Sequence, residues 1–234
     1  AEAEGIEFDV RLAGDGVPVV FHDSDLKRIC GIDRRVSDLS SVELGKLDAG
    51  SWFNEKNRRS AAAKYSKERI PTLEQTLSML SGFQGTIYVE LKARGNSIGK
   101  LAKAVSKIIR NSNLRAQIIV KSFKIQAIPV IRKHAPGVKT ATLFAPKVMN
   151  ILQKEKRLIN ISRDLCADRI SLHFSLATRK LLEKARQNGL PVTIWTADNP
   201  RWIKRAYQLG IDHLITNDPQ KLLSHRDSLL RKAI

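Results

Sequence analysis

The sequence predicts an α/β fold, namely a TIM-type (β/α)8 barrel with a small insertion after the second strand. From Thr86 onward, strand patterns alternate with helix patterns, which is typical of a parallel sheet covered by helices. Two strand patterns place acids on one face and aliphatic residues on the other, as in a barrel with a polar mouth and a helix-covered outside. No Gly-x-Gly-x-x-Gly follows any strand, which disfavours an open Rossmann-like sheet. We expect the whole chain, residues 1–234, to form one domain.

The chain is organised around its first predicted strand, Ile6–Val10. Side chains on a strand alternate between two faces, so the three apolar residues share one face and Glu7 and Asp9 share the other. Two acids facing the interior cost several kcal/mol unless a cation or hydrogen-bond partner compensates them. For either acid alone, a surface hairpin with one solvated face is the simpler interpretation. The second strand, Thr86–Leu91, weakens that interpretation because it repeats the pattern around Glu90.

Asp15-Gly16 indicates a two-residue hairpin turn after the first strand. In that register Asp9 would lie opposite His22, and opposed residues share a face with Cβ atoms roughly 4.5–5.5 Å apart. One hairpin would then gather two carboxylates and an imidazole, a combination suited to metal binding and acid/base chemistry.

The first five residues and the insertion are predicted from capping residues and composition. Residues 1–5 are predicted to be the end of a helix that Gly5 terminates. Within the insertion, about residues 24–70, the stretch 37–44 carries Ser/Asp capping chemistry and predicts a short helix. Residues 54–69 are basic and poor in apolar side chains, which predicts an exposed loop.

Regular structure resumes at Thr72, where Thr72-Leu73-Glu74-Gln75 forms a capping box for a helix. The remaining strands are expected at Thr86–Leu91, Gln117–Ser122, Val138–Leu143, Asp168–His173, Val192–Trp195 and Asp212–Thr216. The helices between them are expected at Ile98–Arg110, Gln126–His134, Val148–Asn160, Leu176–Asn188, Arg201–Leu209 and Gln220–Lys232. Together with Ile6–Val10 this gives seven strands in a βα rhythm, one fewer than a closed barrel.

Composition restricts the partners. Lys and Arg total 41 against 23 Asp and Glu, a net charge of +18, which favours phosphate esters, nucleic acid or an acidic membrane face. No nucleic-acid motif accompanies the charge, so nucleic acid is the weakest of these candidates, and a solvated basic surface explains the excess equally well. The two cysteines, Cys30 and Cys166, form neither a disulfide framework nor a zinc motif. Such sparse cysteine is compatible with a reducing compartment, and we expect a cytoplasmic protein.

Several short motifs, arriving in one order along nearly the whole chain, resemble the glycerophosphodiester phosphodiesterase family. The opening block is the most specific of them in residue type and spacing, and the later pieces support it by their order. These motifs are Glu7-x-Asp9, Asp15-Gly16-x-Pro18-Val19-Val20-x-His22-Asp23 with Leu26 and Arg28, Glu90-Leu91-Lys92, Ser122-Phe123, Trp195-Thr196, and Thr216-Asn217-Asp218-Pro219.

The predicted chemistry is metal-assisted hydrolysis of a glycerophosphodiester. Glu7, Asp9 and Glu90 offer only oxygen, which suits one hard divalent cation, either Mg²⁺ or Ca²⁺. His22 is the expected proton-transfer residue, because its unperturbed pKa of about 6.5 suits both directions near neutral pH. Lys92 would add positive charge beside the substrate phosphate, or else form an ion pair with a neighbouring acid.

Substrate contacts are expected from residues near other strand ends. Trp195 would line the pocket or stack on a choline headgroup, and core packing is the competing role. Phe123, with Ser122, is expected to line the pocket. The family pattern reads Trp-Thr-x-Asn, whereas this chain has Asp198 in the last position, so its headgroup side is expected to differ. His173, which has no partner in the sequence, is expected to be structural.

The resemblance also implies a first βα unit whose strand carries a His-Arg pair, with the first of two catalytic histidines. That unit does not occur in this sequence, and we expect the chain to be a fragment beginning inside the first helix. Two alternatives stay open: a related lysophospholipase D or sphingomyelinase D-like phosphodiesterase, and a non-catalytic phosphodiester-binding barrel.

Overall fold

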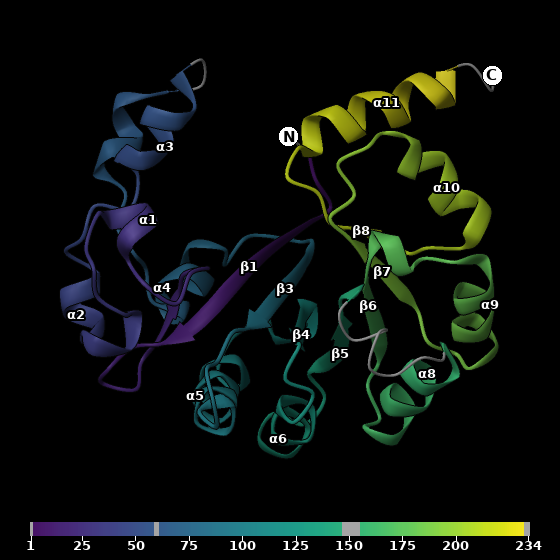
Figure 1. Ribbon diagram of the computed structural model, residues 1–234, viewed down its shortest axis with the longest axis horizontal. Coiled ribbons are helices and arrows are strands. Elements are labelled where there is room, and N and C mark those ends of the chain that lie inside the picture. The colour runs from purple at the N-terminus through teal and green to yellow at the C-terminus, as the bar shows by residue number, and fades with distance from the viewer. Residues whose placement is uncertain (1, 59–60, 147–154, 232–234) are drawn as a thin grey trace.

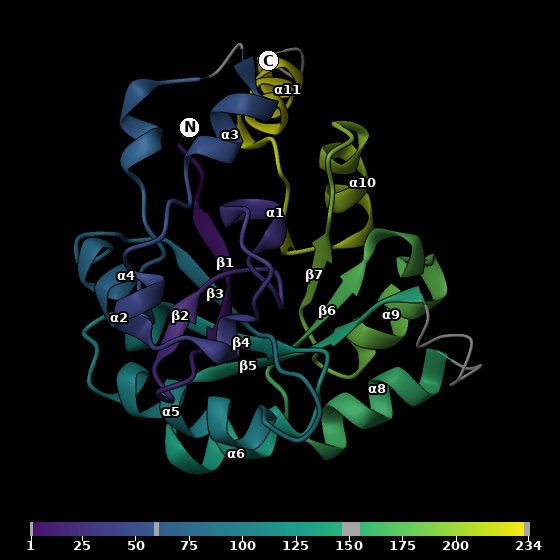
Figure 2. The same ribbon diagram turned by 60° about the vertical axis from the view of Figure 1, so that its left-hand side comes forward.

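The computed structural model describes residues 2–58, 61–146 and 155–231 and confirms the predicted α/β barrel-type fold. An eight-stranded sheet has the order β2-β1-β3-β4-β5-β6-β7-β8, in which the pair β1–β2 is antiparallel and every other pair is parallel. The sheet curves strongly, and helices lie along its outer side (Figures 1 and 2). The seven parallel strands are the seven that the βα rhythm predicts.

The elements after residue 85 follow the predicted ones within a few residues. The strands of the sheet are β1 Gly5–Leu12, β2 Pro18–Val20, β3 Thr86–Leu91, β4 Ile118–Ser122, β5 Lys139–Phe144, β6 Arg169–His173, β7 Val192–Trp195 and β8 His213–Leu214. The α-helices that cover it are α5 Ile98–Arg110, α6 Ala127–His134, α8 Glu155–Asp164, α9 Arg179–Gln187 and α10 Arg201–Leu209. The last helix, α11 Pro219–Arg231, borders the pocket instead. Short 3-10 turns, η4 Arg115–Gln117 and η5 Phe174–Leu176, connect some of them. Residues 148–154 and 232 of the predicted helices lie outside the described residues.

The hairpin between β1 and β2 has a different loop from the predicted one. Val10 pairs with Val20 and the Ala13 amide donates to Val17, so three residues, 14–16, form the loop. Gly16, at φ 81°, supplies the left-handed residue that such a loop requires. The loop is also held by the insertion, because the Gly14 amide donates to Leu39. The predicted two-residue turn is therefore wrong by one residue.

The register places Phe21, rather than His22, opposite Asp9. The Phe21 amide donates to the Asp9 carbonyl at 2.9 Å, and the Phe21 side chain is buried in the insertion. The prediction for the first residues is also wrong: residues 2–4 are not helical, and Gly5 begins β1. This segment pairs with β3 instead, since the Thr86 amide donates to the Glu4 carbonyl.

The insertion is a small subdomain with its own apolar cluster rather than a plain loop. Its elements are α1 Lys27–Cys30, η1 Val36–Asp38, α2 Ser41–Leu44, α3 Ser51–Lys56 and η3 Ala63–Lys67, and α4 Leu73–Met79 follows it. The predicted short helix within 37–44 exists as α2, where Ser40 and Glu43 form a capping box. The predicted exposed loop at 54–69 is wrong in part, because α3 and η3 occupy much of it. T-shaped packing of Phe53 against Tyr65, with ring centroids 5.4 Å apart, joins these two helices.

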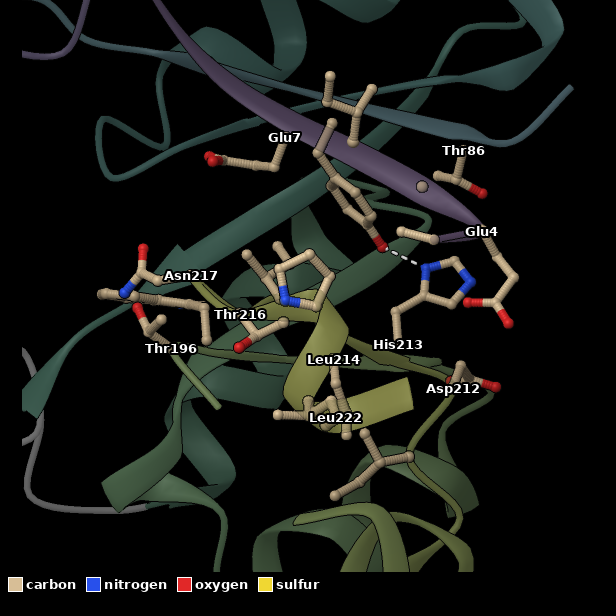
Figure 3. Close-up of a pocket in the computed structure, with 18 of the residues that line it drawn as sticks. Glu4, Glu7, Thr86, Thr196, Asp212, His213, Leu214, Thr216, Asn217 and Leu222 are labelled. Atoms are coloured by element: carbon tan, nitrogen blue, oxygen red, sulfur yellow. Dashed lines mark hydrogen bonds between the residues drawn. The ribbon is translucent and has the colours of Figure 1, made fainter. Parts of the chain in front are cut away.

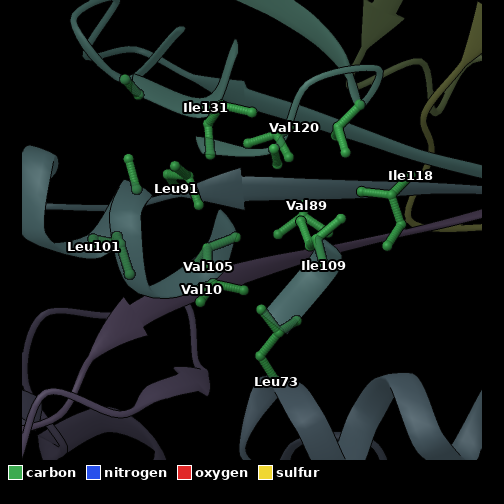
Figure 4. Close-up of a cluster of buried hydrophobic side chains, with 14 of the residues drawn as sticks. Val10, Leu73, Val89, Leu91, Leu101, Val105, Ile109, Ile118, Val120 and Ile131 are labelled. Carbon is green, nitrogen blue, oxygen red and sulfur yellow. The ribbon is translucent and has the colours of Figure 1, made fainter. Parts of the chain in front are cut away.

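The core lies between the outer face of the sheet and its helices (Figure 4). Alternation along β3 directs Ile87, Val89 and Leu91 outward, where each is at most 2% exposed. They pack against the buried faces of α4, α5 and α6 in one cluster, whose labelled members are Val10, Leu73, Val89, Leu91, Leu101, Val105, Ile109, Ile118, Val120 and Ile131. A second cluster joins β5, β6 and β7 to α8, α9 and α10. The opposite residues of each strand therefore face the barrel interior, where the polar groups gather.

The barrel is open between β1 and β8. In the described residues, β1 pairs with β3 and, only through Val10–Leu12, with β2, while β8 pairs with β7. The first half of β1 and the outer edge of β8 border the same pocket. No helix in the part of the chain that the structure describes is both long and apolar enough to cross a membrane.

Candidate active site and metal centre

The predicted site residues meet in one pocket, which runs along the open side of the barrel between β1 and β8 and reaches the carboxyl ends of the strands, where active sites of such barrels form. The pocket has a volume of about 1080 Å³, and Figure 3 shows Glu7 of β1 directed into it, across from Thr216 and Asn217 of the segment that follows β8. All seven predicted residues line it: Glu7, Asp9, His22, Glu90, Lys92, Phe123 and Trp195.

Three carboxylates converge on one point of this pocket. Asp9 lies beside Glu90 in the parallel pairing of β1 with β3, and Glu7 is one step back on the same face of β1. One oxygen from each of Glu7, Asp9 and Glu90 lies within 4.8 Å of the others. An all-oxygen donor set of this size fits a hard divalent cation, as the sequence predicts.

Two lysines bridge the three carboxylates. The Lys92 Nζ atom lies 2.9 Å from Glu90 Oε1 and 3.3 Å from Asp9 Oδ1. The Lys121 Nζ atom lies 2.9 Å from Glu7 Oε1 and 3.4 Å from Glu90 Oε2. The ion-pair role considered for Lys92 is thus the one seen here. Three carboxylates against two ammonium groups leave the cluster with one excess negative charge.

Lys121 is the member of the cluster that the sequence reasoning missed. It follows Ile118-Ile119-Val120 in β4, and alternation places it on the inner face with Ile119. A single charge inside a run of buried aliphatic residues was the available signal, because such a charge needs a partner inside the fold.

Electrostatics at the cluster favour the binding of positive charge. Burial, followed by repulsion from Glu90 and Glu7, raises the pKa of Asp9 from 3.8 to about 6. Burial by itself lowers the pKa of Lys92, but attraction to Glu90 and Asp9 outweighs it and the net pKa is raised. The Asp9 carboxylate is therefore destabilised in its ionised form, and a further cation would relieve it.

His22 follows the hairpin in sequence and lines the pocket, and Asp23 and Arg28 orient its ring. Its Nδ1 lies 2.6 Å from Asp23 Oδ1, and Arg28 Nε donates to the other Asp23 oxygen at 2.6 Å. Hydrogen bonding from Arg28 is the main reason that the pKa of Asp23 is lowered, so Asp23 is an anion that accepts a hydrogen bond from Nδ1–H. The Nε2 atom is then the one that can exchange a proton with a substrate. Arg11 Nε also donates to the His22 carbonyl at 2.9 Å, which fixes the backbone.

Aromatic side chains form one wall of the pocket. Trp195, the last residue of β7, meets Phe123 edge-to-face at 5.5 Å and the His173 ring at 5.1 Å. His173 in turn contacts Phe174 at 4.3 Å and lies 2.8 Å from Ser175 Oγ through its Nδ1. His173 thus supports the wall from behind, in keeping with the structural role predicted for it.

Two further residues near strand ends, Ser122 and Asp198, form hydrogen bonds that hold neighbouring segments in place. Ser122 does not line the pocket, because alternation turns it outward, where it is buried and donates to the Leu91 carbonyl at 2.8 Å. Asp198 accepts hydrogen bonds from Thr216 Oγ1 at 2.9 Å and from the Asn217 amide at 2.8 Å. It therefore fixes the segment that borders the pocket in Figure 3.

A polar layer that includes the Arg169 guanidinium forms the floor of the site. The Tyr88 hydroxyl lies 2.7 Å from both Thr193 Oγ1 and His213 Nδ1, and the buried Arg169 donates into the same group. Burial lowers the pKa of His213, and Arg169 lowers it further. The Arg169 guanidinium is paired in turn with Asp212, whose Oδ2 atom lies 3.8 Å from Nη2.

Comparison with known proteins places the chain in a family of phosphodiesterases. The model of the glycerophosphoryl diester phosphodiesterase family matches residues 1–221. A glycerophosphodiester phosphodiesterase of Caldanaerobacter subterraneus is 28% identical over 225 residues, which is 95% of this chain and 85% of that protein. A human lysophospholipase D is 25% identical over 250 residues, covering 93% of this chain and 75% of that protein. In fold, the chain resembles a phosphodiesterase of Oleispira antarctica, solved in complex with its product sn-glycerol-3-phosphate, with a TM-score of 0.82 and 24% identity over 97% of this chain and 86% of that one.

Proposed function

Because the chain belongs to the glycerophosphoryl diester phosphodiesterase family, we propose that it hydrolyses glycerophosphodiesters to glycerol 3-phosphate and an alcohol. Glycerophosphocholine and glycerophosphoethanolamine are the substrates that we propose first. The observation that carries the proposal is the convergence of Glu7, Asp9 and Glu90 in the pocket that His22 also lines. The sn-glycerol-3-phosphate bound as product by the similar phosphodiesterase of Oleispira antarctica is the product that this reaction would release.

The cation site would consist of Glu7, Asp9 and Glu90, with either Mg²⁺ or Ca²⁺ as its occupant. A divalent cation bound there supplies charge neutralisation at a non-bridging phosphate oxygen and thereby favours in-line displacement. Lys92, bound to two of the three carboxylates, adds positive charge at the same rim of the pocket. These residues would hold the phosphodiester with its reacting phosphorus above the cluster.

His22 would act as the general acid. Its Nδ1 proton is held by Asp23, so the proton on Nε2 is the one transferred to the oxygen of the departing alcohol. The phosphorus–oxygen bond to that alcohol breaks as a water oxygen bonds to phosphorus. The proton that this water loses passes to solvent, and His22 regains a proton from solvent before the next turnover. Arg28 keeps Asp23 ionised and thereby keeps the ring in one orientation.

The aromatic wall would receive the alcohol portion of the substrate. Trp195 and Phe123 present ring faces and edges at the pocket, and a quaternary ammonium group is attracted to such faces. This favours a choline headgroup over an uncharged one. The Phe123 ring is 42% exposed, so it also offers apolar surface to an acyl chain, and a lysophospholipid is the second candidate substrate because a relative is a lysophospholipase D.

Hydrolysis by the full-length protein tests the proposal. We expect release of choline from glycerophosphocholine with Mg²⁺ or Ca²⁺, loss of that activity with a chelator, and slower turnover of lysophosphatidylcholine. Glu7→Ala should abolish the cation-dependent reaction while far-UV circular dichroism stays unchanged. Faster turnover of lysophosphatidylcholine would favour the second substrate, and tight binding of glycerophosphocholine without turnover would indicate a non-catalytic binding barrel. Normal turnover by Glu7→Ala would contradict the site.

A further inference from the structure

Lys121 is a buried lysine whose partners are two of the three carboxylates. Its side chain is 2% exposed, compared with 19% for Lys92, and it lies deeper in the barrel than the rim. The Lys121 Nζ atom contacts Glu7 Oε1 at 2.9 Å and Glu90 Oε2 at 3.4 Å. The ring of Tyr88 lies beneath it, with its centroid 5.9 Å from Nζ.

A buried ammonium group is costly unless carboxylates compensate it. In the described part of the chain, the carboxylates in ion-pair contact with Lys121 are Glu7 and Glu90, which are also the proposed cation ligands. The reverse also holds: without an added cation, Glu7 and Glu90 depend on lysine for compensation of their own charge. Lys121 and a divalent cation therefore act on the same two side chains.

Both oxygens of Glu90 are in contact with lysine. Lys92 contacts Oε1 at 2.9 Å, and Lys121 contacts Oε2 at the longer distance of 3.4 Å. A cation that binds Glu90 therefore shares a carboxylate oxygen with a lysine and repels both ammonium groups, and the longer contact, to Lys121, is the one we expect to lengthen first. Glu7 keeps a second oxygen for the cation while its Oε1 remains with Lys121.

We propose that Lys121 is an internal counter-cation, which holds Glu7 and Glu90 together in the cation-free protein and lowers the affinity of the site for a divalent cation. This inference rests on the cation site of the proposed function. With Lys121 present, the cluster carries one negative charge, and without it the cluster would carry two. Removing Lys121 should thus weaken the cation-free fold and strengthen cation binding.

Isothermal titration of the full-length protein with MgCl₂ and with CaCl₂ tests the inference, using Lys121→Met and the matched control Lys124→Met. Lys124 is exposed and lies three residues further along the same chain segment, so its replacement changes net charge equally without touching the cluster. We expect Lys121→Met to bind the cation at least about tenfold more tightly than the wild type, and Lys124→Met to match the wild type. Thermal unfolding with a chelator should show a lower Tm for Lys121→Met, and a larger rise in Tm when the cation is added.

A double variant separates charge from packing. Lys121→Met with Glu7→Gln removes one charge of each sign, so its Tm in chelator should exceed that of Lys121→Met alone. If Lys121→Met folds only with added cation, or if the double variant folds where the single variant does not, the inference is supported. Failure of both variants to fold, with or without cation, would overturn it in favour of a packing role.

The outcomes also separate this inference from the proposed function. Cation binding by the wild type, with the same affinity in Lys121→Met as in Lys124→Met, would overturn the role of Lys121 and leave the cation site standing. Absence of binding in the wild type and in every variant would overturn both. Cation binding by Lys121→Met, with none by the wild type or Lys124→Met, would support the inference, because Lys121 would then exclude the cation completely.

Discussion

Replacing Asp9 with asparagine should stabilise the cation-free protein while removing its activity. Burial and the neighbouring Glu90 and Glu7 raise the pKa of Asp9 from 3.8 to about 6 in the folded protein. A raised carboxyl pKa means that the ionised form is less favourable in the folded than in the unfolded state. The penalty is absent below about pH 4, where the carboxyl is protonated in both states, grows as the pH rises to about 6, and is constant above that.

The size of the effect follows from the shift. A difference of one pH unit in pKa corresponds to about 1.4 kcal/mol, so the shift of Asp9 limits the penalty to about 3 kcal/mol at neutral pH. Asparagine keeps an oxygen that can accept a hydrogen bond from Lys92, so the packing of the cluster is preserved. Asp9→Asn should therefore raise the free energy of unfolding in chelator by about 2 kcal/mol at neutral pH and leave it nearly unchanged at about pH 4.

Urea denaturation in the presence of a chelator, at the two pH values, measures this difference, and hydrolysis of glycerophosphocholine with added cation measures the functional loss. A stabilisation at neutral pH alone supports the electrostatic reasoning. Equal changes at both pH values, or a destabilisation at neutral pH, would show that the raised pKa of Asp9 does not describe this cluster.

Three other substitutions give separate tests. His22→Asn should lower kcat by a factor of about 10²–10⁴ with little change in KM, because it removes a proton donor without changing the cation site; an unchanged kcat would exclude His22 as the acid. Trp195→Ala should raise KM for glycerophosphocholine more than KM for an uncharged-headgroup analogue, by the loss of about 1 kcal/mol of cation–π attraction, and equal effects on both substrates would assign Trp195 to packing alone. Gly16→Ala should reduce the free energy of unfolding by about 1 kcal/mol, because alanine is strained at the φ of 81° that Gly16 adopts. The added methyl group meets no neighbour, so backbone strain is the whole effect, and thermal unfolding that matches the wild type would contradict it.

The sequence predicted the strands and helices well where their patterns were long. The helix Ile98–Arg110 and the strand Thr86–Leu91 have the predicted bounds, because their apolar periodicity is regular and the barrel buries it on the expected side. The errors lie where contacts distant in sequence decide the local structure. The hairpin loop is held by Leu39 of the insertion, and residues 2–4 are not helical, the Glu4 carbonyl accepting a hydrogen bond from the Thr86 amide.

The candidate site could be predicted from residue types, but its electrostatics could not. Glu7, Asp9 and Glu90 alternate with apolar residues along their strands, and this alternation predicts that all three face the barrel interior. Lys121 is on a different strand and has no neighbouring acid in the sequence, so its contacts with Glu7 and Glu90 depend on the order of strands in the sheet. The aromatic support of Trp195 by His173 has the same origin, since β6 and β7 are neighbours only in the folded sheet.

The position of a bound divalent cation tests the central claim most directly. Crystals grown or soaked with MnCl₂, which substitutes for Mg²⁺ and is visible by anomalous scattering, should show one strong anomalous peak in contact with oxygens of Glu7, Asp9 and Glu90, at about 2.0–2.6 Å. That peak should disappear in Glu90→Gln crystals prepared identically. A peak elsewhere in the molecule, or none at a concentration that supports full hydrolytic activity, would contradict the claim that these three carboxylates form the metal centre.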